Sequence, residues 1–148
     1  MKLPEQITLN AHWLLRFAIV GVFLFHGLLK FANLEGFATM LPISYTEVVL
    51  VAFAETGGAV LLLLGGFGAS RFFDMTTRIG ALLNIPVMIG AIATVHWGQW
   101  NFLPSESHPM GGIQFQVVLA LVMLYIAVTG NHGLRVNGAS TGFLKQTI

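Results

Sequence analysis

The sequence predicts an all-α, polytopic membrane protein that folds as an antiparallel bundle of four transmembrane helices. Of its 148 residues, 55% are hydrophobic and only 9% are charged, whereas a soluble domain carries about 25% charged residues. Four apolar stretches are long enough to cross a bilayer as helices, at residues 13–32, 48–67, 79–95 and 112–129. Short connections join them, so successive helices are expected to be antiparallel neighbours.

The first two spans are expected to be retained helices that pack closely. The segment before residues 13–32 is polar and lacks a small-residue cleavage signal, so this span is not a signal peptide. Within residues 48–67, the run VLLLL at 60–64 shows no alternation of period two, which excludes a barrel strand. Glycine pairs at 57–58 and 65–66 would let this helix approach its neighbours.

The third and fourth spans complete the single transmembrane domain that is expected for the chain. Pro86 lies in the middle of residues 79–95 and predicts a kink there. Residues 112–129 form the fourth expected span, and residues 130–148 form a polar tail. Together the spans and connections use nearly the whole length, which leaves no room for a soluble catalytic domain.

The distribution of basic residues predicts the orientation, because cytoplasmic loops of membrane proteins carry an excess of Lys and Arg. One side of the predicted bundle has only Lys30. The other side holds Lys2, Arg16, Arg71, Arg78, Arg135 and Lys145. We therefore expect a multi-pass protein of the cytoplasmic (inner) membrane with both termini in the cytoplasm and the loop at 97–111 facing outward.

Composition also excludes several classes of function. The formal net charge of +1 argues against nucleic acid as a partner, because nucleic-acid binding calls for a basic patch. The chain has no cysteine, which excludes disulfide exchange, thiolate metal sites and cysteine-ligated iron–sulfur clusters within it. The lipid bilayer is the partner that the composition requires.

Two ionisable residues lie well inside the first two spans, and both are candidate catalytic residues. His26 precedes Ala32 by six residues, which places it ~9 Å below the outer end of the first span. Glu55 follows Val48 by seven residues, which places it ~10 Å below the same end of the second span. Ionisable groups in hydrocarbon are costly and mark functional sites. We predict a His26–Glu55 pair that exchanges protons with a redox ligand. The alternative is a buried polar network that only fixes the packing of these helices.

Further polar residues are expected around the same outward-facing pocket as substrate-binding groups. Lys30 lies four residues beyond His26, on the same helix face, although it is also close enough to the interface to snorkel. His96 ends the third span on the outer side, and Gln114 and Gln116 begin the fourth span there. All four helices thus direct polar groups toward one pocket.

Arg16 is a further candidate substrate-binding residue, near the inner end of the first span. Two structural alternatives remain open for it. Its guanidinium could snorkel to the inner interface, or it could pair with Asp74.

Haem and metal sites are weaker alternatives. His26 and His96 could be axial haem ligands, but their expected depths in the membrane differ. His96, Glu106 and His108 could bind a metal, but their spacing matches no specific ligand pattern. We predict neither haem nor a metal site.

Two motifs together resemble the DoxX family of small four-helix membrane proteins. In the first span, Leu15-Arg16 is followed by GVFLFHGLLKF at residues 21–31. In the second span, ETGGA at residues 55–59 is followed by leucines and by Gly65-Gly66. The resemblance covers roughly residues 14–130 and includes Arg16, His26, Lys30 and Glu55.

The resemblance implies a role in membrane redox systems. DoxX-type chains include a subunit of a thiosulfate:quinone oxidoreductase and a member of a mycobacterial membrane assembly linked to superoxide dismutase and a sulfurtransferase. By this resemblance, the chain is expected to be a subunit of, or accessory to, a membrane oxidoreductase. Its partner would be a redox protein or a second copy of the chain.

The predicted mechanism places a quinone, or a similar small apolar redox ligand, between the first, second and fourth helices near the outer leaflet. His26 and Glu55 would handle protons, and Lys30 would hold a ligand carbonyl or an anionic substrate. His96 and Gln114 would line the mouth of the pocket. Two alternatives stay open: a non-catalytic membrane anchor for a soluble redox partner, and a small-solute carrier.

Overall fold

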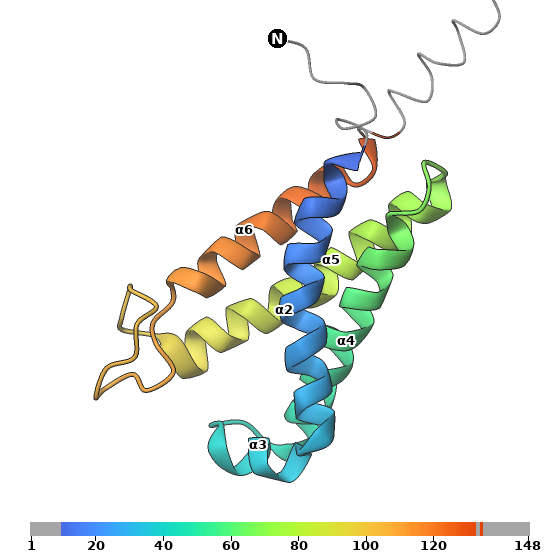
Figure 1. The fold of residues 1–148 in the computed structure, drawn as a ribbon. Coiled ribbons are helices and arrows are strands. Elements are labelled where there is room, and N and C mark those ends of the chain that lie inside the picture. The colour runs from blue at the N-terminus through green and yellow to red at the C-terminus, as the bar shows by residue number, and fades with distance from the viewer. Residues whose placement is uncertain (1–9, 133, 135–148) are drawn as a thin grey trace, which may run out of the picture.

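The structure, a computed structural model, describes residues 10–132 and 134. The regular elements in this part of the chain are all helices (Figure 1). The elements in chain order are α2 (His12–Ala32), α3 (Leu34–Met40), α4 (Tyr45–Gly65), α5 (Arg71–Ala91), the π-helix η1 (Ile92–His96) and α6 (Gln114–Thr129). The predicted all-α class is confirmed for this part of the chain. Most of the predicted polar tail lies outside the described residues.

Three of the helices are long and apolar enough to cross a membrane. α2 and α4 have 21 residues each, and α5 with η1 has 26. α6 is also apolar but has only 16 residues, or ~24 Å of helix. It begins at Gln114, and the Gly112 and Ile113 N–H groups just before it bond to the carbonyl oxygens of Asn101 and Gln99 in the preceding loop.

The third helix starts at Arg71, eight residues before the predicted span at 79–95. Its first two turns carry Asp74 and Arg78, which form a salt bridge of 3.0 Å. A search for apolar stretches misses these two turns because they contain polar side chains. Those side chains find their hydrogen-bond partners inside the protein. The helix continues through Pro86 and ends in η1.

Residues 33–46 were expected as a plain loop, and the structure shows a short helix there. Asn33 caps α3, because its side chain accepts a hydrogen bond from Gly36 N–H at 3.0 Å. Ser44 and Glu47 form a reciprocal capping box that opens α4. Local polar side chains, rather than apolar periodicity, therefore determine where α3 and α4 begin.

Helix α4 lies between α2 and α5 and contacts both through small residues. A Cβ atom added to Gly58 would lie 2.8 Å from the carbonyl oxygen of Gly80, and one added to Gly80 would lie 2.8 Å from that of Gly58. The backbones of α4 and α5 therefore touch at this crossing, as in other membrane helix pairs. On the other side, a Cβ atom at Gly27 of α2 would lie 2.9 Å from the amide nitrogen of Thr56.

Asn131, directly after α6, joins the ends of four helices. Its side-chain amide donates to the carbonyl oxygens of Gly65 and Gly68, both at 2.7 Å. Its side-chain oxygen accepts from Arg16 of α2 at 2.7 Å and from Thr77 of α5 at 3.0 Å. We call Asn131, Arg16, Thr77 and their bonded groups the Asn131 network. All three side chains are at least 97% buried, and all of these bonds except the one to Gly68 are fully buried.

Asp74 and Arg78 extend the network to the C-terminal end of α6. Gly130 has a φ of +53°, which favours glycine, and a Cβ atom there would collide with the Asp74 carboxylate. The next backbone N–H donates to that carboxylate at 2.7 Å. Arg78 donates to the carbonyl oxygens of Ala127 and Val128, both at 2.7 Å, which satisfies acceptors that the helix leaves unpaired.

We predict that Thr77→Val lowers the free energy of unfolding by ~1–3 kcal/mol, since it keeps the shape of a fully buried side chain but removes the hydroxyl that bonds Arg16 and Asn131. Thr46→Val on the exposed surface of α4 is the matched control and should change little. Unfolding in detergent micelles measures both. Equal stability of the two variants would contradict a structural role for the network.

Candidate functional site

A cavity of about 730 Å³ opens at the end of the helices that is remote from the Asn131 network. It is lined by the second half of α2, by α3, by the first half of α4, by the end of α5 with η1, and by the start of α6. Figure 1 shows α5 and α6 leading away from α2 and α4 toward this end. The volume falls within the range of small-molecule sites, and most of the lining is apolar.

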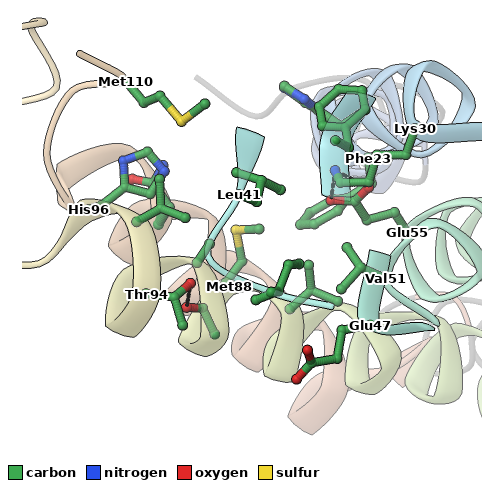
Figure 2. Close-up of a pocket in the computed structure, with 18 of the residues that line it drawn as sticks. Phe23, Lys30, Leu41, Glu47, Val51, Glu55, Met88, Thr94, His96 and Met110 are labelled. Atoms are coloured by element: carbon green, nitrogen blue, oxygen red, sulfur yellow. Dashed lines mark hydrogen bonds and ion pairs between the residues drawn. The ribbon is translucent and has the colours of Figure 1, made fainter. Parts of the chain in front are cut away.

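Lys30 and Glu55 form a buried ion pair on one side of the cavity. The Lys30 ammonium lies 2.7 and 2.9 Å from the two carboxylate oxygens of Glu55 (Figure 2). Lys30 is 7% exposed and Glu55 is 4% exposed. The ammonium also lies 5.6 Å from the ring centroid of Phe37 in α3, a cation–π distance. The pair therefore ties α2, α3 and α4 together at the wall of the cavity.

The partner of Glu55 is thus Lys30, whereas equal depth in the sequence left open whether His26 and Glu55 touch. No hydrogen bond or ion pair joins His26 to Glu55 in the part of the chain that the structure describes. Gly27 explains why Glu55 pairs with Lys30. It lets α4 approach α2 so closely that a Cβ atom added to Gly27 would lie 3.1 Å from Cβ of Glu55. His26 lies beside this contact rather than on it. It is exposed, lines the cavity, and packs edge-on against the ring of Phe25.

His96 lies on the opposite side of the cavity from the ion pair (Figure 2). Its Nδ1–H donates to the carbonyl oxygen of Gly111 at 2.8 Å. Because a carbonyl can only accept, this bond places the proton of the neutral imidazole on Nδ1 and leaves Nε2 as an acceptor. The side-chain amide of Gln116 then donates to Nε2 at 2.9 Å. The π-helix η1 carries His96, and such turns recur at functional sites.

Gln116, rather than the predicted Gln114, lines the cavity from α6. Residues two apart on a helix do not share a face, so only one of the two glutamines can point inward. Both begin the fourth helix, and polarity alone does not distinguish them. The carbonyl oxygen of the Gln116 side chain is buried and has no hydrogen-bond partner among the described residues.

Comparison with known proteins assigns the family. A sequence model of the DoxX family matches residues 11–97. The chain belongs to the DoxX family. It is also 30% identical over 125 residues to the protein named "Putative oxidoreductase CatD" of Bacillus subtilis (strain 168), which covers 82% of this chain and 80% of that protein. No solved structure matches.

The DoxX-family match includes Arg16, but the structure places Arg16 away from the cavity. Its guanidinium donates to the carbonyl oxygen of Leu62 at 3.1 Å and to Thr77 and Asn131, and it contacts Nδ1 of His12 at 2.7 Å. These contacts use up to four of its five N–H donors, and two of them are made to the Thr77 and Asn131 side chains of the Asn131 network. The expectation of a substrate-binding role for Arg16 is therefore replaced by a structural one.

His96 and His108, both considered above as haem or metal ligands, make hydrogen bonds in the structure. Both ring nitrogens of His96 are hydrogen bonded, so neither offers an open lone pair to iron. His108 contacts the carbonyl oxygen of Trp97 through its Nε2 atom, at 2.7 Å. Within residues 10–132 and 134, no three His, Asp or Glu side chains lie together as metal ligands would.

The ion pair gives a direct test of the site. We predict that Lys30→Met and Glu55→Gln each lower the free energy of unfolding by ~3–5 kcal/mol, because the first leaves a buried charge unpaired and the second leaves an ammonium without its counter-charge. The double variant Lys30→Met/Glu55→Gln should lose much less than the sum.

Unfolding of all four proteins in the same detergent micelles measures this coupling. Glu106→Gln in the exposed loop controls for the loss of a carboxylate in general. Additive losses in the double variant would show that Lys30 and Glu55 do not interact.

Proposed function

We propose that this chain is an integral component of a membrane redox system and that its cavity binds a quinone or a similar small apolar redox ligand near the outer leaflet. The observation that carries the proposal is the arrangement of polar groups around an apolar cavity. Lys30 and Glu55 lie on one side of it and His96 on the other (Figure 2), while residues such as Phe23, Met88 and Leu41 line the space between.

This arrangement fits the chemistry of a quinone. A quinone has an apolar ring with oxygen atoms at opposite edges, and it binds where hydrogen-bonding groups face both edges. Lys30 uses two of its three ammonium hydrogens on Glu55, so the third can donate to a ligand oxygen. Gln116 supplies an amide on the other side.

The ion pair also favours a neutral ligand over an anionic one. Glu55 already compensates the charge of Lys30 at 2.7 Å, so the two side chains together carry no net charge. An anion placed beside them would lose its hydration without gaining an unpaired cation. A neutral quinone loses little on entering an apolar cavity.

Reduction of a quinone to a quinol consumes two electrons and two protons. In this proposal the electrons come from a redox protein that assembles with the chain, and the protons pass through titratable groups on the cavity wall. His26 is exposed, lines the cavity and lies one helical turn from Lys30, which suits it to exchange protons with the surroundings. Glu55 would accept or release a proton as the ion pair adjusts to the ligand. The name of the Bacillus subtilis relative is consistent with a redox role.

The membrane arrangement is part of the proposal. α2, α4, α5 with η1, and α6 would cross the bilayer as an up-down four-helix bundle in the cytoplasmic membrane. Both termini would lie in the cytoplasm, as the basic residues predict. The short helix α6 would be accommodated by local thinning of the bilayer and by the loop before it. The cavity would then open toward the outer leaflet.

We predict that Met88→Trp weakens binding of decylubiquinone, a short-tailed quinone, by more than about tenfold. Met88 is 7% exposed and lines the cavity, so a larger ring there fills the space the ligand needs. Equilibrium dialysis against the purified chain in detergent measures the affinity.

Met75→Trp is the matched control, since Met75 belongs to the same helix but is 47% exposed and does not line the cavity. The thermal midpoint of each variant shows that it is folded. Equal quinone affinity in both variants would contradict the proposed site. Absence of quinone binding by the unsubstituted chain would favour the anchor or carrier alternatives.

A further inference from the structure

We infer that the cavity has a side opening toward the lipid, between α4 and α5, and that the long apolar tail of the ligand lies in this opening. The inference rests on the proposed function and narrows its substrate class to a quinone that carries a tail and is dissolved in the membrane, rather than a water-soluble one. It depends on how the four helices close the cavity, pair by pair.

Two of the helix pairs around the cavity are joined by polar side chains. The Lys30–Glu55 ion pair joins α2 to α4, with distances of 2.7 and 2.9 Å. The hydrogen bond between Gln116 and His96, which is 2.9 Å long, joins α6 to η1 at the end of α5. A tail that passed between either pair of helices would have to separate these polar partners, which is costly in an apolar environment.

The helices α4 and α5 are not joined in this way beside the cavity. They touch where Gly58 meets Gly80, and from that crossing toward the cavity no hydrogen bond or ion pair joins them among the described residues. Both helices contribute residues that line the cavity and are also exposed. Leu50 of α4 is 62% exposed, and Pro86 and Gly90 of α5 are exposed as well. The cavity is therefore open to its surroundings between these helices.

Gly90 shows that α4 and α5 have separated at the level of the cavity. A Cβ atom added to Gly90 would meet no side chain and no neighbouring helix within 4 Å. At Gly58 and Gly80, in contrast, an added Cβ atom would lie 2.8 Å from a carbonyl oxygen of the other helix. The two helices thus diverge from their crossing toward the cavity, as Figure 1 also shows. The absence of a side chain at Gly90 leaves the opening wider still.

The polar side chains on this side of the cavity have partners close by in the chain. Apart from Glu55, they are Glu47 from α4 and Thr94 from α5 (Figure 2). The Thr94 hydroxyl donates to the carbonyl oxygen of Gly90 at 2.8 Å. The Glu47 carboxylate accepts bonds from the N–H and the hydroxyl of Ser44, both at 2.7 Å. A hydrocarbon tail can lie against such groups without removing a hydrogen-bond partner from them.

The remaining pair, α2 and α6, suits an apolar tail less well. No hydrogen bond joins these two helices beside the cavity within the described part of the chain, but His26 lines that side and is exposed. Phe23 of α2 and Leu119 of α6 are also buried in the same apolar core, which narrows this side. The side with His26 suits proton exchange, and the α4–α5 side suits the tail.

The experiment compares two quinones that differ only in the tail: decylubiquinone and 2,3-dimethoxy-5-methylbenzoquinone, which has a hydrogen in place of the decyl chain. Gly90→Leu puts a side chain into the opening. We expect it to weaken binding of the tailed quinone by about tenfold or more, because a packed site tolerates added volume poorly. The tailless ring does not use the opening, so its affinity should change much less.

Equilibrium dialysis against the full-length chain in detergent measures both affinities. Each quinone partitions into the micelles to the same extent with every variant, so the comparison between variants cancels this effect. Gly21→Leu on α2 is the matched control. Gly21 is exposed, does not line the cavity, and likewise has open space around an added Cβ atom. This control should leave both affinities unchanged.

The outcomes separate this inference from the proposal on which it rests. If Gly90→Leu weakens both quinones equally, or behaves like Gly21→Leu, the inference is wrong and the quinone site stands. If the unsubstituted chain binds neither quinone, the proposed function fails and this inference with it.

Should Gly90→Leu not fold, a quinone with an azide part-way along its tail tests the inference in the unsubstituted chain. Photolysis should label residues at the opening such as Leu50, Pro86 and Thr94, and excess decylubiquinone should suppress these labels. Absence of such labels, or suppressible labels on His26 or Phe115 beside α2 and α6 instead, would overturn the inference.

Discussion

A single buried asparagine just beyond α6 determines how the helices can be arranged. Asn131 bonds the end of α4, the start of α2 and the start of α5, and it follows directly on α6. In an apolar environment each of these polar groups would be costly without a partner, so the four helix ends are held together. The Gly58–Gly80 contact then brings the backbones of α4 and α5 together where they cross. The other end has no equivalent network among the described residues, and the cavity forms there.

The Lys30–Glu55 pair gives the cavity its character. A buried ion pair contributes little net stability, because desolvation offsets most of the attraction. What it provides is a cavity wall between α2 and α4 that carries two opposite charges and no net charge. One ammonium hydrogen of Lys30 is left for a ligand. Opposite it, His96 and Gln116 form a second polar wall whose hydrogen-bond directions are determined by a loop carbonyl. In the function we propose, a cavity built in this way would distinguish ligands by the hydrogen bonds they can make rather than by their charge.

Much of this could be predicted from the sequence, and the failures have identifiable physical reasons. Hydropathy places α2 and α4 in the chain, although the Ser44–Glu47 capping box starts α4 before the apolar stretch. Hydropathy also shows the importance of Glu55, because an acid in an apolar span needs a partner. Depth along a helix is easily estimated, whereas rotation about its axis is not. The pairing of Glu55 with Lys30 rather than His26 depends on that rotation, which the close contact at Gly27 sets.

The same limit explains why Gln116 rather than Gln114 lines the cavity, since polarity alone does not say which face of α6 turns inward. The early start of α5 at Arg71 was missed for a different reason. Its polar side chains are satisfied by partners as far along the chain as Asn131, and no local pattern reveals such partners.

The central claim is that a neutral quinone occupies the cavity, and photoaffinity labelling tests it most directly. An azido-quinone would be photolysed with the chain in membranes, and the labelled residues would be located by mass spectrometry. The account predicts labels on cavity-lining residues such as Phe37, Met88 and Met110, and loss of those labels when unlabelled quinone is in excess. Labels confined to lipid-facing residues such as Met75 and Leu82, unaffected by competing quinone, would contradict it.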